Sequence, residues 1–174
     1  MILEGIGEDP KRPGIVDTPR RVAEMYAEVF RHVGQDASKE LTVIHNETHE
    51  EMVVVKDIVF HSMCEHHLLP FFGKAHVVYI PKKGRITGIS KIYRVIENLA
   101  GRPQLQERMT TGIAEAMMST LQPQGVMVVL EAEHLCMSMR GTKKPGHTVI
   151  TSAVRGLLEK NPATRAEALS LIKP

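Results

Sequence analysis

Two short segments of the sequence combine cysteine with histidine. In the first, Cys64 is followed by His66 and His67, and in the second, much further along the chain, His134 precedes Cys136. Thiolate sulfur and imidazole nitrogen are the ligands that Zn²⁺ prefers in proteins. The two segments therefore predict one zinc site to which both contribute.

The spacing within each segment sorts the candidate ligands. If the first segment forms a helical turn, Cys64 and His67 share one face, because residues three apart are neighbours on a helix, and His66 projects to the side. If the second segment continues an extended strand, His134 and Cys136 share a face, because strand side chains alternate. We therefore predict Cys64, His67 and Cys136 as the zinc ligands. The two remaining histidines then lie close enough to act on whatever binds the metal.

Three protein ligands leave a fourth position for water, which is typical of a catalytic zinc site. The alternative is a closed site in which His134 is the fourth ligand and the metal holds the fold together, because Cys₂His₂ is a common structural set. A further interpretation, in which the cysteines are only small buried hydrophobic residues, is weaker because histidines accompany both of them. Spacing alone does not decide between the open and the closed site.

The rest of the sequence predicts the elements that position these residues. Asp17, a first-turn proline, an apolar stripe with 3.6-residue spacing and a final Gly34 predict an amphipathic helix. Further helices are expected from a cap at Ser90, from about residue 104 to 121, and from Pro162. Runs rich in β-branched residues predict strands at 41–45, 52–60, 74–81, 85–89, 126–134 and 148–154.

The order of these elements predicts the fold class. Short polar connections at residues 46–50 and 82–84 join the first four predicted strands into two hairpins. Strand pairs with short turns and helices grouped in the middle favour an α+β domain with an antiparallel sheet over a doubly wound parallel one. The chain has 174 residues, of which 43% are hydrophobic, and this suits one compact domain.

Composition and charge limit the partners. Residues 1–73 hold 7 basic and 13 acidic residues, whereas residues 74–144 hold 11 basic and 5 acidic ones. A local positive field suits a small polyanion such as a triphosphate, although a bias of this size is also compatible with an ordinary solvated face. With no Trp and 4% aromatic residues, the sequence gives little support for stacking on nucleic-acid bases. We expect no nucleic-acid partner.

Several classes of protein are excluded by missing patterns. No apolar run approaches the length that crosses a bilayer, and residues 1–5 lack the start of a secretory signal, so we expect a cytoplasmic protein without a membrane partner. In that reducing compartment the two cysteines stay free for metal. The sequence has neither a phosphate-binding Gly-x-x-x-x-Gly-Lys-Ser/Thr loop nor the cytidine-deaminase pattern.

At this point several ordered segments resemble the GTP cyclohydrolase I family. The most specific are Cys64-Glu-His-His67 with the residues up to 76, and His134-Leu-Cys136 with the residues up to 141. Residues 17–23, 88–94, 104–108 and 148–152 match as well, in the same order. The resemblance extends from about residue 5 to the C-terminus.

The resemblance implies a tunnelling fold: an antiparallel β-sheet with helices packed on one side and an N-terminal helical segment. It implies a single domain over residues 1–174, with a helical part at 1–40 and a catalytic part at 41–174. It also implies a homodecamer made of two pentamer rings, with active sites between subunits.

The implied activity is the zinc-dependent hydrolysis of GTP to 7,8-dihydroneopterin triphosphate and formate, the first step of tetrahydrofolate or pterin biosynthesis. Water activated by zinc attacks guanine C8, which requires the metal because bulk water is a weak nucleophile at neutral pH. Zn²⁺ is the one cofactor expected. The alternatives are a zinc-stabilised binding module of the same fold without turnover, and a related purine- or pterin-processing enzyme.

The resemblance also assigns residues to roles. Cys64, His67 and Cys136 align with the zinc ligands, which places His134 outside the metal shell. The expected catalytic residues are His66, His134 and Ser90, the two histidines as acid/base groups and the serine close to the ribose and phosphates. The expected substrate-binding residues are Glu107 for the guanine N–H groups with Gln106 beside it, Lys91, Arg94 and Arg140 for the triphosphate, and Arg21 from a neighbouring subunit.

Each of these residues also has an ordinary interpretation. Taken singly, Glu107 would belong to a solvated helix face, and Lys91 and Arg94 would form an exposed pair, because exposed charge on a helix is the usual case. Their matched order along the chain favours the functional interpretation.

Overall fold

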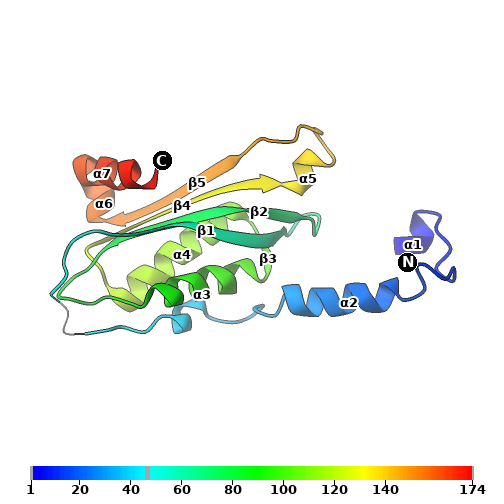
Figure 1. The fold of residues 1–174 in the computed structure, drawn as a ribbon, viewed down its shortest axis with the longest axis horizontal. Helices are drawn as coiled ribbons and strands as arrows, with labels where there is room; N and C mark the ends of the chain where they lie inside the picture. Colours follow the sequence, from blue (N-terminus) through cyan, green and yellow to red (C-terminus); the bar gives the residue numbers. More distant parts are fainter. Residues whose placement is uncertain (1, 46–47, 174) are drawn as a thin grey trace. The chain divides into compact units, whose positions relative to one another are not determined.

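The computed structural model describes residues 2–45 and 48–173, which fall into two compact units, Met1–Arg31 and His32–Pro174. The first unit contains α1 (Ile2–Gly5) and α2 (Thr18–Val29), labelled in Figure 1. The predicted amphipathic helix is thus present and begins after Asp17, but it ends before the expected Gly34. Within the described ranges, no helix is both long and apolar enough to cross a membrane.

The second unit is organised around one five-stranded sheet (Figure 1). In spatial order its strands are β3 (Pro103–Gln104), β1 (Val53–Cys64), β2 (Pro70–Ile80), β4 (Gly125–His134) and β5 (Val149–Gly156). All neighbouring strands are antiparallel except β1 and β3, which are parallel. The antiparallel α+β architecture predicted from the sequence is confirmed.

One face of the sheet carries the main core. The 3₁₀ helix η1 (Ala37–Glu40), α3 (Ile89–Ala100) and α4 (Gln106–Leu121) pack on this face (Figure 1). Val77 and Tyr79 of β2 point into it, because alternate strand residues share a face. The apolar stripe of α3 supplies Ile92 and Ile96, both 1% exposed. Helices thus cover this side of the sheet as expected, but the other face carries helices as well.

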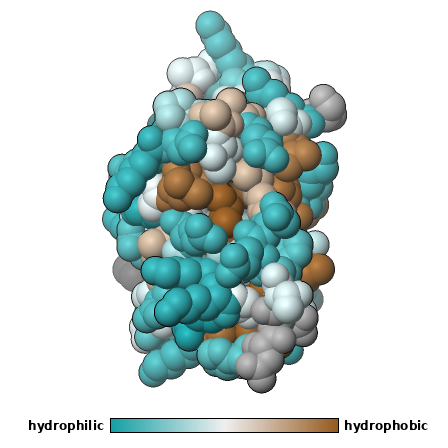
Figure 2. Space-filling view, turned by 90° about the vertical axis from the view of Figure 1, so that its left-hand side faces the viewer, coloured by the Kyte–Doolittle hydropathy of each residue, from teal (hydrophilic) through white to brown (hydrophobic). Residues whose placement is uncertain are grey.

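A smaller core lies on the other face of the sheet at one end. Val78 and Ile80, the alternate residues of β2, pack there with Leu158 of α6 (Leu157–Lys160) and Ala168 of α7 (Pro162–Ile172). Seen from that end, the surface is largely hydrophilic, and hydrophobic side chains show at several places between polar ones (Figure 2). The helix α7 corresponds to the one predicted from Pro162.

The two predicted hairpins are wrong. β1 pairs with β2, and residues 41–45 and 85–89 contribute only the isolated bridge between Ile44 and Ile86. Long apolar strands bury more side chains on pairing than the short segments beside them, so tertiary packing overrides the local turn signals. Residues 46 and 47 of the first predicted turn lie outside the described residues.

The start of α3 also differs from the prediction. The helix begins at Ile89 with Gly88 at its N-cap, so Ser90 lies inside the first turn instead of capping it. The remaining strands and the helix predicted from about residue 104 lie within a few residues of their expected bounds.

The backbones of β2 and β4 approach each other closely near the end of the sheet. Gly73 is paired with Ala132, and a Cβ atom added at Gly73 would lie 1.9 Å from the Glu131 carbonyl oxygen. That distance is far inside van der Waals contact, so any side chain there would force the two strands apart.

Replacing Gly73 by alanine should therefore destabilise the fold. We expect Gly73→Ala to lower the free energy of unfolding by about 2 kcal/mol or more, as overpacked sites do, in urea denaturation followed by circular dichroism. Gly5→Ala is the matched control, because a Cβ at Gly5 meets nothing within 4 Å. Equal stability of the two variants would contradict the interpretation.

Candidate metal centre and active site

The candidate site lies where β1 and β4 end. Both strands are antiparallel to β2, so they run in the same direction and finish at the same edge of the sheet, at Cys64 and His134. After β1 the chain makes one turn, closed by a hydrogen bond from the Leu68 N–H to the Cys64 carbonyl at 2.8 Å. The expected turn through His67 is thus present.

The prediction for the second segment needs a correction. The strand ends at His134, and the next residues form the short helix α5 (Leu135–Ser138), so strand alternation does not bring His134 and Cys136 to a common face. Helical geometry instead turns Cys136 towards the first segment. The ligand atoms of Cys64, His67 and Cys136 all lie within 4.8 Å of one another.

These three side chains fit a zinc ion. Zn–S distances of about 2.3 Å and Zn–N distances of about 2.0 Å place tetrahedral ligand atoms somewhat under 4 Å apart, so small movements suffice. Burial raises the pKa of the Cys136 thiol, and the neighbouring Cys64 raises it further. A bound divalent cation reverses this direction, because metal coordination stabilises the thiolate.

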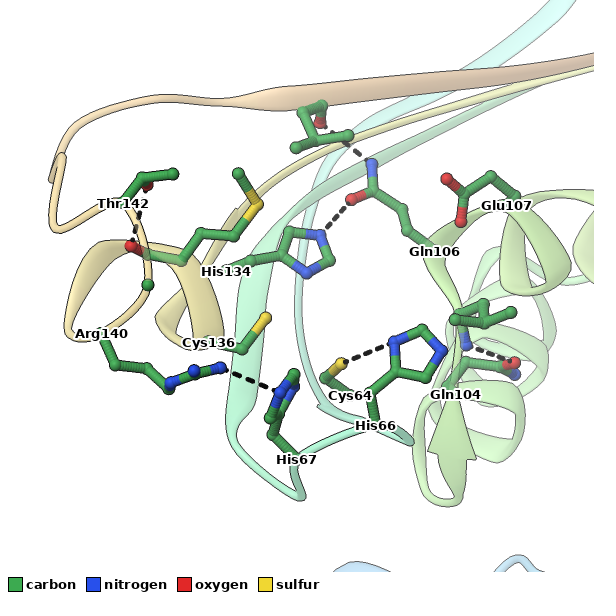
Figure 3. A pocket seen from close by; sticks show the side chains of 14 residues that line it. Cys64, His66, His67, Gln104, Gln106, Glu107, His134, Cys136, Arg140 and Thr142 are labelled. Carbon is green, nitrogen blue, oxygen red and sulfur yellow. Dashed lines mark hydrogen bonds between the residues drawn. The ribbon is translucent and has the colours of Figure 1, made fainter.

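A cavity of about 420 Å³ opens beside the cluster. His66, His134, Glu107 and Arg140 line it together with the three candidate ligands, as Figure 3 shows. The cavity therefore holds two histidines outside the three-residue cluster, one carboxylate and one guanidinium. This set of groups supports hydrolytic chemistry on a substrate that carries both N–H donors and negative charge.

His66 lies on the exposed turn after β1. Its Nδ1 is 3.9 Å from the Cys64 sulfur, and its ring meets that of His67 edge to face, with ring centroids 6.3 Å apart. The expected sideways projection of His66 from the turn agrees with this arrangement. The imidazole of His66 therefore lies next to the three-residue cluster, whereas His67 is one of its members.

His134 is held on the inner wall of the cavity. Its ring stacks flat on Phe71, with centroids 4.6 Å apart, and its Nε2 lies 2.7 Å from the side-chain oxygen of Gln106. Burial lowers the pKa of His134, while the charge of Glu107 acts in the opposite direction. His134 is not part of the three-residue cluster, which favours the open site over the closed one.

Arg140 contacts the cluster directly. One of its guanidinium nitrogens donates to His67 Nε2 at 2.9 Å. A neutral imidazole has a single ring lone pair, and a metal ion takes it, so the other nitrogen then carries hydrogen and cannot accept a bond. Metal binding at His67 therefore requires Arg140 to leave this position, which frees its cation at the cavity.

An ion pair joins the cysteine-containing turn to α4. Arg108 and Glu65 form two hydrogen bonds, the longer at 3.2 Å, and Arg108 lowers the pKa of the Glu65 carboxyl. Glu107, the preceding residue, lies in the first turn of α4, where the helix dipole favours a carboxylate. The pair therefore connects the candidate guanine-binding residue with the candidate metal ligands.

Comparison with known proteins identifies the family. The family model described as GTP cyclohydrolase I matches residues 1–173. GTP cyclohydrolase 1 of Carboxydothermus hydrogenoformans is 64% identical over 99% of this chain and 90% of the relative, and that of Bacillus subtilis is 60% identical over 99% and 91%. The chain belongs to the GTP cyclohydrolase I family.

One solved structure is a more distant match. The apo form of the archaeosine synthase QueF-Like aligns with a TM-score of 0.49 and 21% identity, covering 60% of this chain and 93% of that one. Likeness at this level does not inform function. The tunnelling fold expected from the sequence is instead supported by membership of the GTP cyclohydrolase I family.

Four residues that the family resemblance implied at the active site are not among the described residues that line the cavity. Ser90, Lys91 and Arg94 are on the first half of α3 and do not belong to the described cavity lining. The last residue of α3, Ala100, accepts a bond from Ser62 near the end of β1, so the helix begins toward the opposite end of the sheet. Arg21 lies on α2 of the first unit, exposed, 3.8 Å from Asp17.

Sequence reasoning missed two residues of the site. Phe71 belongs to a matching segment but looks like an ordinary strand residue until the register places it opposite His134. Arg108 looks like an exposed helix charge until the turn with Glu65 lies beside it. Only the register of β2 with β4 and the packing of α4 reveal these contacts.

The cluster should bind one divalent ion per chain. We expect Co²⁺ added to metal-free protein to give the intense thiolate charge-transfer absorption of a tetrahedral two-cysteine site, since both sulfurs face the same point. Cys136→Ser should weaken this absorption and lower the zinc content, while His66→Ser should keep both. Zinc loss in His66→Ser would mean that the ligand assignment is wrong.

Proposed function

We propose that the protein is a zinc-dependent GTP cyclohydrolase I that converts GTP and water to 7,8-dihydroneopterin triphosphate and formate. The observation that carries this proposal is the cluster of Cys64, His67 and Cys136 beside a cavity with two further histidines, in a chain of this family. Opening the guanine imidazole ring and releasing formate are hydrolytic steps that need a strong nucleophile and proton transfer at fixed positions.

Zn²⁺ held by these residues would supply such a nucleophile, because it lowers the pKa of its bound water to about 7. In our proposal His66 donates a proton to N7 as C8 becomes tetrahedral, and its position beside Cys64 supports this role. His134 then assists the opening of the ribose before the rearrangement and ring closure. Glu107 accepts the guanine N–H groups, which its place on the cavity wall supports.

We further propose that each active site is completed by a second copy of the chain. Arg140 is the candidate triphosphate ligand in the described cavity lining, whereas Ser90, Lys91 and Arg94 lie toward the other end of the sheet. In a ring of subunits, one copy's metal end and a neighbour's α3 can face each other. The proposed assembly is the homodecamer implied by the family, with Arg21 supplied by a neighbour.

A cytoplasmic location is part of the same proposal. Cys64 and Cys136 are free thiols, and both are needed in reduced form as metal ligands. Zinc thiolate sites of this kind suit a reducing compartment.

GTP turnover tests the proposed activity. Zinc-loaded protein incubated with GTP should release formate and form a pterin that fluoresces after oxidation. His66→Ser should retain zinc and lose about 100-fold or more of the turnover rate, the usual effect of removing a general acid. His61→Ser is the matched control, because His61 stacks on Phe72 of β2 and does not belong to the described cavity lining. A zinc-loaded, oligomeric sample without product would favour a non-catalytic binding module, and a different purine or pterin product would favour a related enzyme.

Co-expression of two inactive variants tests the shared site. Cys136→Ser removes a ligand from the metal half of the site. The double variant Lys91→Ala/Arg94→Ala removes two cations from the proposed phosphate-binding half. If the halves come from different chains, random assembly of equal amounts restores about a quarter of the sites. Co-expression of Cys136→Ser with His66→Ser is the control and should restore none, because both lesions affect one half. Failure of the first pair to recover activity would place the cations in the same chain's site.

A further inference from the structure

Gln106 is the most completely bonded side chain near the cavity. It is 1% exposed, at the first position of α4. Its side-chain nitrogen donates to the carbonyl oxygens of Leu130 and Val149, at 3.2 and 3.0 Å, and lies 3.1 Å from the hydroxyl oxygen of Thr151. Three oxygens from β4 and β5 therefore surround the amide nitrogen.

These contacts fix which way the amide points. Carbonyl oxygens only accept hydrogen bonds, so the group that faces Leu130 and Val149 must be the NH₂. The reversed orientation would bring the amide oxygen against two carbonyl oxygens, and none of these three atoms can donate a hydrogen bond to another. The amide oxygen of Gln106 therefore faces His134, as Figure 3 shows.

Two threonines reinforce this orientation. The Thr110 hydroxyl donates to the Gln106 backbone carbonyl at 2.7 Å and lies 2.6 Å from the Thr151 hydroxyl. Because the Thr110 proton is used in the first bond, the Thr151 hydroxyl must donate to Thr110. The Thr151 oxygen is then free to accept from the Gln106 amide, and the ring of bonds is consistent throughout.

The orientation of Gln106 determines the state of His134. An amide oxygen can only accept, so the His134 Nε2 that lies 2.7 Å away must carry the hydrogen. In the neutral ring the lone pair is then on Nδ1. The edge of the ring opposite Gln106 faces the side of the cavity where Cys64, Cys136 and His66 lie (Figure 3).

We propose that Gln106 is a positioning residue that holds His134 as the Nε2–H tautomer, with Nδ1 presented to the substrate as a proton acceptor. The role differs from the substrate contact that the family resemblance implied for Gln106, because its side-chain nitrogen and oxygen are both engaged by the protein. Phe71 fixes the plane of the ring, and Gln106 fixes its rotation and its proton. The inference rests on the proposed function, in which His134 transfers protons.

Kinetics separate a positioning residue from a substrate contact. We expect Gln106→Leu to keep its zinc and lower kcat by about tenfold to a hundredfold with little change in KM, because the lost group acts through a proton-transfer residue. A raised KM with unchanged kcat would instead assign Gln106 to the substrate and overturn the proposal.

A double-mutant cycle distinguishes positioning from general stability. In a His134→Ala background, Gln106→Leu should have no further effect on kcat, because the residue through which it acts is gone. Gln104→Leu is the matched control: Gln104 is also buried, at 2% exposed, but it bonds to Leu99 and Leu105 instead of His134. Its effect should be independent of His134→Ala. Full additivity for Gln106→Leu would overturn the proposal.

The tautomer can also be measured without any variant at Gln106 and without turnover. In ¹⁵N spectra of protein labelled at histidine, the signals of His134 are identified by their loss in His134→Ala. We expect the Nε2 signal of the neutral ring to be that of a protonated nitrogen. An unprotonated Nε2 would contradict the proposal even in a fully active enzyme, and an inactive protein with a protonated Nε2 would contradict only the proposed function.

Discussion

The pairing of β2 with both β1 and β4 is the constraint on which the site depends. Because β2 is antiparallel to each, β1 and β4 deliver Cys64 and His134 to the same edge of the sheet. Side chains alternate along a strand, so a slip of one residue would turn His134 to the other face. The close approach at Gly73 and the stacking of Phe71 on His134 resist such a slip. Strand register therefore sets the chemistry of the cavity before any ligand binds.

The side chains on the two sides of the cavity differ in how rigidly the protein holds them. Behind His134, the buried amide of Gln106 is bonded to β4 and β5, and a buried network of this kind has one low-energy arrangement. On the other side, His66 and His67 lie on an exposed turn, and Arg140 must change its partner when metal binds. A hydrolytic site needs both properties: proton acceptors at fixed positions, and charged groups that rearrange as the substrate enters.

The sequence predicts the local part of this arrangement better than the distant part. Cys64 and His67 are three residues apart, and a single turn is enough to bring them together, so their spacing carries the information. Cys136 is on a helical turn and not on the expected strand, yet either local geometry presents its sulfur near the end of β4. The prediction of two hairpins was wrong because it used local turn signals alone. The pairing partner of β1 depends instead on the burial of whole strands. The role proposed for Gln106 could not be predicted, since it requires the positions of β4 and β5 together.

An electrostatic argument favours the proposed division of the site between two chains. In the proposed site the carboxylate of Glu107 accepts guanine N–H groups, while the triphosphate needs several cations. If Lys91 and Arg94 lay beside Glu107, they would pair with it, and each pair would have to be broken before GTP could bind. The start of α3 lies toward the other end of the sheet, which keeps its cations apart from Glu107 within one chain. In the proposed oligomer, opposite charges would then meet opposite ends of the substrate, so the specificity for a guanine that carries a triphosphate would arise only on assembly.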